Sequence, residues 1–385
     1  MPRASIRNRR RVLTPPLLVS QLETPATLVD LDRLAANLDR MAAYCAVHGL
    51  SLRPHVKTHK SPRIAAEQLR HGATGLTCAT PRELEVMSEI CDDLLLAYPL
   101  VGPAKTRRVL TLRRDVRLTV ALDSLEALEP LAEAAEAAHR EVGVYVEVDV
   151  GMHRVGVESA EQAVALARRA RALSPLRYRG IAFYPGHIRE PVAEQDAKLA
   201  RLSDELGALT RALGDAGVAP EVVSGGSTPA AWRMHEVGGV TEVRPGTYVY
   251  NDRATAEMGA CGLDECALTV LATVVSTAVP GQAVVDAGTK ALGREPLPAG
   301  ERAGFACVLD HPDVRVTRMS EEHGILDLSG TSWRPKVGDT VRLIPNHVCI
   351  VVHLNDALYG VRGEIVETDW PVSARGRGAA PATTV

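Results

Sequence analysis

A dense run of cationic side chains occupies positions 53–60 of the chain, with the sequence RPHVKTHK. It follows the apolar residues Leu50 and Leu52, so the run falls where a buried strand would end. A lysine at such a place is either a solvated strand end or an amine made nucleophilic by partial desolvation and cationic neighbours. Lys57 is the candidate for the second role, and its neighbours are Arg53, His55, His59 and Lys60.

Glycine and hydroxyl side chains recur at two later positions where apolar segments end. One is SGGST at 224–228 and the other is RPGTY at 244–248. A Gly-Gly pair is often only a turn, but together the segments let backbone N–H groups, hydroxyls and a guanidinium converge on an anion. In a parallel barrel, phosphate sites form between the ends of the seventh and eighth strands. The candidate binding residues are Gly226, Ser227, Thr228, Arg244, Gly246, Thr247 and Tyr248.

Three more side chains that could take part in catalysis or binding follow the predicted fifth and sixth strands. Arg154 lies in DVGMHRVG at 149–156, and Tyr184 and His187 bound the segment YPGH. Arg154 is either a surface charge or a bidentate donor to a phenolate or carboxylate. Tyr184 is either a packed aromatic or a partner for a flat ring. His187 is either a loop histidine or a general acid or base.

A histidine and a cysteine separated by one residue suggest a metal site. His347 and Cys349 lie in PNHVCIVVHL, which we predict to be a strand. Side chains at i and i+2 of a strand share a face about 6.6 Å apart, and leaning side chains can close onto one ion. Two ligands are too few for a structural zinc, so an ion would keep open positions; the alternative is a core cysteine beside a hydrogen-bonded histidine. Residues that could support the ligands are His311, Glu322, His323 and His353.

The elements that must position these residues alternate between strand and helix from residue 25 to residue 253. Eight such units, counted from the lysine strand, predict an α/β fold with a (β/α)8 TIM-type barrel, in which chemistry lies at the strand ends. The alternative is an open doubly wound sheet. Such a sheet would be expected to have a G-x-G-x-x-G turn after its first strand, and this sequence has none there. We predict a basic arm at 1–24 joining an antiparallel β domain at 254–372, which holds the metal site, and a disordered tail at 373–385.

Composition narrows the class of protein. Hydrophobic residues make up 46% and charged residues 24%, and the net charge of -3 argues against nucleic acid as a partner. The seven cysteines are scattered, with no Cys-x-x-Cys pair, which is typical of a reducing compartment. No secretory signal and no apolar run of about 18 residues is present, so we predict a cytoplasmic protein that does not use a membrane.

These motifs resemble the fold type III pyridoxal-phosphate enzymes, the alanine racemase-like barrel class, and within it the D-threonine aldolase and D-serine dehydratase family. The most specific parts are RPHVKTHK at 53–60 and PNHVC at 345–349. The resemblance implies pyridoxal 5'-phosphate on the Schiff-base lysine Lys57. It also implies a divalent metal on His347 and Cys349: zinc first, with manganese or magnesium as alternatives. It further implies that Thr228, Gly246 and Thr247 hold the phosphate, that Arg154 and Tyr184 lie near the ring, and that the protein is a homodimer.

The resemblance leads to a lyase acting on small D-β-hydroxy-α-amino acids. A cysteine at position 349 favours a D-serine or D-threonine type dehydratase, which eliminates water to give a 2-oxo acid and ammonia. The alternative is a D-threonine aldolase, in which the metal or His187 helps to deprotonate the hydroxyl and glycine and an aldehyde are formed. An amino-acid racemase and a non-catalytic carrier of pyridoxal phosphate are further alternatives; the β domain argues against the carrier.

Overall fold

The computed structural model describes residues 17–297 and 303–376, which divide into two compact units. One unit combines the chain up to Ala35 with Cys266–Val372, and the other combines Ala36–Glu265 with the segment from Ser373. The division falls inside helix α1 (Leu31–Val47), whereas the sequence prediction began the barrel at residue 25. Most of the predicted basic arm and of the predicted tail lies outside the described residues.

Eight parallel strands form the sheet of the second unit, in the order β3-β10-β9-β8-β7-β6-β5-β4. The sheet closes because the chain beyond β3 pairs in parallel with β4, through a bridge between His55 and Thr77. The predicted (β/α)8 barrel is therefore confirmed, and the open sheet is excluded. The strands are β3 (Ser51–Leu52), β4 (Leu76–Cys78), β5 (Asp93–Leu96), β6 (Arg117–Leu122), β7 (Val142–Val148), β8 (Leu176–Phe183), β9 (Val222–Gly225) and β10 (Glu242–Val243).

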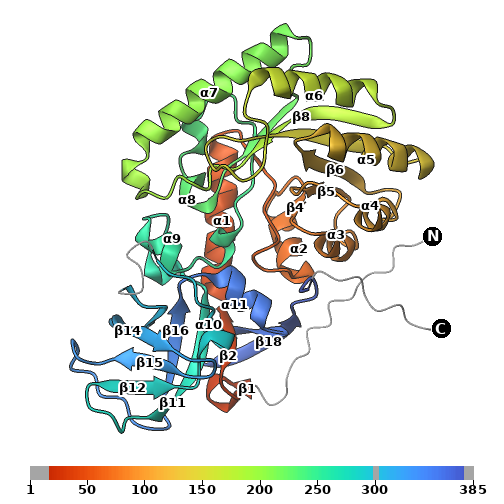
Figure 1. The fold of residues 1–385 in the computed structure, drawn as a ribbon. Coiled ribbons are helices and arrows are strands. Elements are labelled where there is room, and N and C mark those ends of the chain that lie inside the picture. Colours follow the sequence, from red (N-terminus) through yellow and green to blue (C-terminus); the bar gives the residue numbers. More distant parts are fainter. Residues whose placement is uncertain (1–16, 298–302, 377–385) are drawn as a thin grey trace, which may run out of the picture. The chain divides into compact units, whose positions relative to one another are not determined.

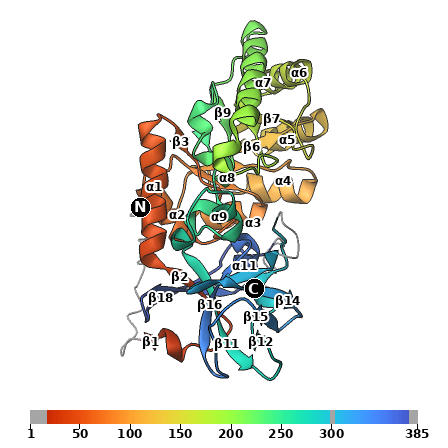
Figure 2. The same ribbon diagram turned by 90° about the vertical axis from the view of Figure 1, so that its left-hand side faces the viewer.

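Helices follow the strands and lie along the outside of the sheet (Figures 1 and 2). They are α2 (Pro62–Arg70), α3 (Pro81–Met87), α4 (Pro103–Leu110), α5 (Leu125–Ala137), α6 (Ala160–Ala172), α7 (Asp196–Asp215), α8 (Thr228–Ala231) and α9 (Arg253–Glu257). Helix α7 buries five leucines spaced three or four residues apart, which is the pattern of one helix face packed on a sheet. Among the described residues, no helix combines the length and the apolar character needed to cross a bilayer.

The interior of the barrel contains buried charged side chains. Arg53 donates to Glu242 and to Asp93, each at 2.7 Å. Glu242 also accepts the hydroxyl of Ser224 at 2.6 Å, and that hydroxyl receives the Arg244 guanidinium at 2.7 Å. Burial alone would lower the pKa of Arg53, but the two carboxylates outweigh it and raise that pKa above its usual value. A continuous chain of ion pairs and hydrogen bonds thus runs through the barrel.

Strands of the first unit form a ten-stranded sheet in the order β1-β18-β17-β2-β11-β12-β15-β14-β13-β16 (Figure 1). Because β11 also pairs with β16, the strands from β11 to β16 form a closed ring. The pairs are antiparallel as predicted, except that β2 and β17 run parallel. The strands are β1 (Leu17–Leu18), β2 (Ala26–Asp30), β11 (Leu268–Ser276), β12 (Gln282–Val285), β13 (Ala306–Val308), β14 (His311–Met319), β15 (Gly324–Asp327), β16 (Thr340–Pro345), β17 (Ala357–Arg362) and β18 (Ile365–Pro371).

The segment that carries the predicted metal ligands is not a strand, and that prediction is wrong. Strand β16 ends at Pro345, and helix α11 (Val348–Leu354) begins three residues later. His347 is the N-cap residue of this helix. Val348, Val351 and Val352 are buried, and their spacing is that of one helix face, so burial outweighs the strand preference of β-branched residues. One further short helix, α10 (Thr289–Leu292), belongs to this unit.

Candidate active site

Three predicted site residues meet at the carboxyl ends of the barrel strands. Lys57 lies in the turn that follows β3, Arg154 in the loop after β7, and Tyr184 directly after β8. The Lys57 Nζ atom lies 5.6 Å from the centroid of the Tyr184 ring, and the Arg154 Cζ atom lies 4.9 Å from it. Both distances fall within the range of cation–π contacts. The structure therefore brings an amine, a guanidinium and an aromatic face together from three separate segments.

The loop that presents Arg154 is held by Asp149, at the end of β7. The Asp149 carboxylate accepts backbone N–H groups of Gly151, Met152 and His153, at 3.0, 2.9 and 3.0 Å respectively. Partial burial would raise the pKa of Asp149, but these hydrogen bonds outweigh it and leave that pKa below its usual value. The sequence analysis did not assign Asp149 a role, and its place at a strand end was the available signal.

The predicted anion-binding segment carries buried hydroxyls that the protein leaves without partners. Ser227 and Thr228 are each 5% exposed, and neither side-chain oxygen has a hydrogen-bond partner among the described residues. Buried hydroxyls normally find a partner, so this pair fits a ligand that brings acceptor oxygens. Gly226 has a φ of +97°, which favours glycine at this turn. The arrangement suits a phosphate group.

Gly246 follows β10, which is the eighth strand of the barrel, and lies close to the turn that carries Lys57. A Cβ atom at this position would come within 2.9 Å of the Thr58 Oγ1 atom and 3.1 Å of the His55 carbonyl oxygen. A side chain larger than hydrogen would therefore push the turn that carries Lys57. Thr247 follows, half-buried, and its carbonyl oxygen accepts backbone N–H groups from positions 250 and 251.

Two residues predicted to bind the cofactor are committed to other contacts. The Arg244 guanidinium donates to the carbonyl oxygens of Ser224 and Phe183, at 2.8 and 3.0 Å. The Tyr248 hydroxyl is buried and receives the amide of Gln68 at 3.0 Å. Burial raises the pKa of Tyr248, so its hydroxyl is neutral at physiological pH. Their direct contact with a cofactor remains a prediction.

The cationic neighbours of Lys57 are largely neutralised, which differs from the sequence-based expectation. Lys60 forms a buried ion pair with Glu83, and Arg53 forms its two ion pairs inside the barrel. The His59 ring is buried and hydrogen-bonded to the side chain of Gln68 at 3.1 Å. Desolvation, followed by the charge of Lys57, holds the pKa of His55 well below its usual value, so that ring is neutral. The partners of Lys60, Arg53 and His59 come from other segments of the chain and could not be predicted from the sequence of the run.

His187, the predicted acid or base, lies half-buried in the loop after β8. Its ring atoms lie 3.4 Å from where a Cβ atom of Gly151 would be, so it packs on the loop of Arg154. Its Nδ1 atom is buried and has no hydrogen-bond partner among the described residues. Burial is the main cause that lowers the pKa of His187, which keeps the ring neutral and able to accept a proton.

The predicted metal ligands belong to the other unit, at the start of α11. His347 and Cys349 are both half-buried, whereas the six other cysteines are buried. An imidazole and a thiol one residue apart are donors that suit zinc, and their partial exposure leaves room for further ligands. Within the described part of the chain, the group of three metal-ligating side chains within mutual reach is a different one, Asp149, His153 and Glu158 in the barrel unit.

Comparison with known proteins places this chain among relatives of the same architecture. The family model described as alanine racemase, N-terminal domain, matches residues 29–254, and the model of a putative serine dehydratase domain matches residues 267–361. The chain belongs to the alanine racemase N-terminal domain family. The two matches correspond to the barrel and to most of the β domain. The resemblance to fold type III enzymes of the D-threonine aldolase and D-serine dehydratase family is thus confirmed.

Relatives cover nearly the whole chain. A D-threonine aldolase from Arthrobacter is 33% identical over 93% of this chain and 94% of the relative. The crystal structure of a D-threonine aldolase from Filomicrobium marinum has a TM-score of 0.86 at 33% identity, and covers 94% of this chain and 97% of that one. The structure of a D-threo-3-hydroxyaspartate dehydratase from Delftia sp. HT23 has a TM-score of 0.84 at 32% identity. The match covers 94% of this chain and 100% of that one.

Proposed function

We propose that this protein is a pyridoxal-phosphate- and metal-dependent lyase of D-β-hydroxy-α-amino acids, acting as a dehydratase of the D-serine or D-threonine type. The observation that carries the proposal is the meeting of Lys57 and Arg154 over the ring of Tyr184. The family supports it, since its members in the comparisons include dehydratases and aldolases of such substrates. The resemblance stated from the sequence implies that Cys349 favours the dehydratase.

The residues that would hold pyridoxal phosphate are those that the barrel gathers. Lys57 would carry it covalently, and the unpartnered hydroxyls of Ser227 and Thr228 would donate to its phosphate. Tyr184 and Arg154 would lie near its ring, and Gly246 leaves the space that the turn carrying Lys57 needs. When bound, the cofactor supplies an electron sink for charge that develops at the substrate α-carbon. Arg244 and Tyr248 would hold the neighbouring loops in position.

Side chains of this protein would carry out the proton transfers. The Lys57 amine would remove the proton from the substrate α-carbon on the side that it occupies, which selects the D configuration. His187, neutral because of burial, would accept or return a proton near the same ring. A divalent ion on His347 and Cys349 would supply Lewis acidity. Zinc is the ion that this donor pair favours, and a metal-free form of a mutant D-threo-3-hydroxyaspartate dehydratase is among the similar structures.

The products formed from D-serine and D-threonine test the reaction. We expect pyruvate and 2-oxobutyrate, each with one equivalent of ammonia, because elimination of the hydroxyl leaves the carbon skeleton intact. Incubation of the enzyme with each substrate, followed by keto-acid and ammonia assays, measures this outcome. The L-amino acids serve as the control and should be turned over at least about a hundredfold more slowly, since the proton would face away from Lys57. Glycine and an aldehyde would instead reveal the aldolase.

The aldolase is the second candidate, and the D-threonine aldolase from Arthrobacter at 33% identity favours it. Both reactions begin with the same bound substrate and differ in the bond that breaks. In the aldolase, the metal or His187 would help to deprotonate the hydroxyl, and the bond between Cα and Cβ would break. Loss of optical activity without keto acid or glycine would point to a racemase.

Removal of the metal tests the role of α11. We expect Cys349→Ala to lower metal affinity by about tenfold or more, the scale on which metal-site side chains act. Elemental analysis of purified protein, and activity after EDTA treatment and zinc addition, measure the effect. Cys45→Ala is a matched control, because burial raises the pKa of the Cys45 thiol to about 12 and keeps it protonated. Activity that persists without metal would contradict the metal role.

We also propose a homodimer, as in the sequence prediction, and light scattering of the purified protein tests it. The absence of a nucleic-acid partner and the cytoplasmic location remain predictions from composition.

A further inference from the structure

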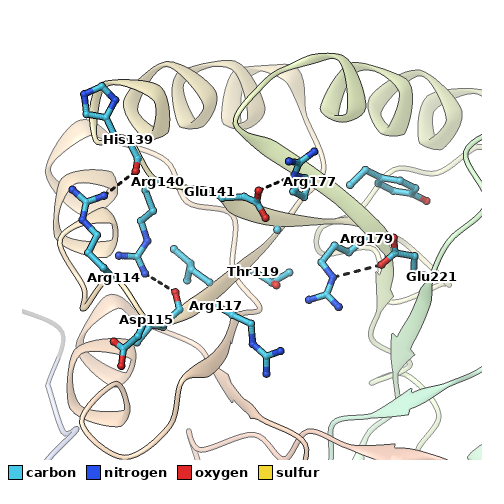
Figure 3. A pocket seen from close by; sticks show the side chains of 14 residues that line it. Arg114, Asp115, Arg117, Thr119, His139, Arg140, Glu141, Arg177, Arg179 and Glu221 are labelled. Atoms are coloured by element: carbon cyan, nitrogen blue, oxygen red, sulfur yellow. Dashed lines mark hydrogen bonds and ion pairs between the residues drawn. The ribbon is translucent and has the colours of Figure 1, made fainter.

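A cavity of about 550 Å³ opens where the barrel strands begin (Figure 3). The residues that line it precede or start β6, β7, β8 and β9. Because all eight strands are parallel, these starts lie at the opposite end of the barrel from the turn that carries Lys57. The cavity is therefore separate from the proposed site of chemistry, and its volume lies in the range of small-molecule pockets.

Arginine dominates the charge of this cavity. Five arginines line it, at positions 114, 117, 140, 177 and 179, against three carboxylates at positions 115, 141 and 221. Three of the arginines use their donors within the protein. Arg114 and Arg140 donate to main-chain carbonyl oxygens, and Arg177 donates to Glu141 at 2.8 Å. The Nε atom of Arg140, a residue only 4% exposed, has no partner among the described residues.

The remaining two arginines keep most of their donors available. Arg179 is joined to Glu221 by an ion pair of 3.7 Å, which is too long for a hydrogen bond. Arg117 makes one ion pair of 3.1 Å with Asp93. Figure 3 shows Arg117 and Arg179 among the side chains that line the cavity, with Thr119 close to Arg179.

Thr119 and Gly143 complete the arrangement. Thr119 is 4% exposed, and its hydroxyl makes no hydrogen bond with any residue that the structure describes. A Cβ atom at Gly143 would lie 2.6 Å from the Thr119 hydroxyl oxygen and 3.1 Å from the Cδ atom of Arg179. Glycine at this point of β7 thus keeps open the space between the Thr119 hydroxyl and the Arg179 side chain.

We propose that this cavity binds a phosphate dianion between Arg117 and Arg179, with the Thr119 hydroxyl as a third donor. Two guanidinium groups and one hydroxyl offer more hydrogen-bond donors than a planar carboxylate can use, which matches the several acceptor oxygens of a tetrahedral anion. Glu221 competes for Arg179, so it weakens the site without blocking it. The phosphate can be free or part of an organic molecule, and the volume has room for either.

Calorimetric titration of the cofactor-loaded enzyme with sodium phosphate, and separately with adenosine monophosphate, tests the proposal at low ionic strength. We expect one site per chain whose affinity falls about tenfold or more in Arg179→Gln and in Arg117→Gln, since each loses charge-assisted hydrogen bonds. Glu221→Gln should bind severalfold more tightly, because it releases Arg179. Arg201→Gln, with a side chain 82% exposed on α7, removes the same charge elsewhere and should change nothing.

The outcomes distinguish free phosphate from an organic phosphate and show which results overturn the proposal. Tighter binding of the nucleotide assigns the site to an organic phosphate, and equal or tighter binding of inorganic phosphate assigns it to the free ion. No titratable site, or a site with the same affinity in the wild type, Arg179→Gln and Glu221→Gln, overturns the proposal. Since the cofactor occupies its own place in all variants, a wrong assignment of the reaction would leave this result unchanged.

Discussion

Replacing Lys57 by alanine is expected to remove covalently bound pyridoxal phosphate and to lower activity by at least about a thousandfold. The reason is that Lys57 is the lysine whose Nζ atom lies over the Tyr184 ring, 5.6 Å from its centroid. The nearby Lys60 cannot substitute, because it is held in a buried ion pair with Glu83. Borohydride reduction followed by peptide mapping measures the attachment, and an absorbance band at about 420 nm reports it without digestion.

Lys290→Ala is the matched control for this experiment. The Lys290 Nζ atom pairs with Glu322 at 2.7 Å, and both side chains are more than half exposed, at 64% and 61%. Exposed pairs of this kind contribute little, so activity and cofactor content should stay within about twofold of the wild type. A borohydride label on another lysine, or a band that survives in Lys57→Ala, would refute the assignment of the lysine.

The gathering of Lys57, Arg154 and Tyr184 could be predicted because it follows from topology. Alternating strands and helices imply a parallel barrel, and a parallel barrel brings the residues after each strand to one end. Lys57 and Arg154 are 97 positions apart and Arg154 and Tyr184 are 30 apart, yet each lies directly after a strand or in the loop that follows one. Motif position was sufficient here, since no knowledge of side-chain partners was needed.

Side-chain partners could not be predicted in the same way. The run RPHVKTHK suggested a cluster of positive charge, but Arg53 and Lys60 meet carboxylates at Asp93, Glu242 and Glu83. These partners lie between 23 and 189 positions away. A charge pattern read along the chain therefore overstates the field at Lys57, because burial requires each charge to find a partner from another strand or helix.

Helix α11 shows the corresponding limit for secondary structure. Its sequence contains three valines and an isoleucine, which favour strands, and it follows a strand without a glycine between them. The signal that predicts the helix is the spacing of Val348, Val351 and Val352, all of which are buried. The segment with that spacing is short and lies within a continuous apolar run, so periodicity alone does not distinguish a helix from a strand here.

The charged interior of the barrel leads to the largest expected change in stability. Glu242→Gln keeps the shape of the side chain but removes the carboxylate that joins Arg53 to Ser224, and through Ser224 to Arg244. Arg53, Arg244 and Glu242 are 6%, 6% and 3% exposed, so the two guanidinium groups would remain buried with less compensation. Breaking a buried ion pair on one side costs about 3–5 kcal/mol, and we expect a loss of that size in the free energy of unfolding. Urea denaturation of the full chain measures it.

Glu205→Gln provides the comparison that makes this result specific. Glu205 also pairs with an arginine, Arg201, at 2.7 Å, but the two side chains are 44% and 82% exposed on α7. Solvent screens such a pair, so its loss should change the free energy of unfolding by less than about 0.5 kcal/mol. Equal losses in the two variants would show that the interior carboxylate does not hold the barrel together. A large loss confined to Glu242→Gln would show that a buried chain of charges, rather than apolar packing alone, fixes the strands whose far ends carry the proposed site.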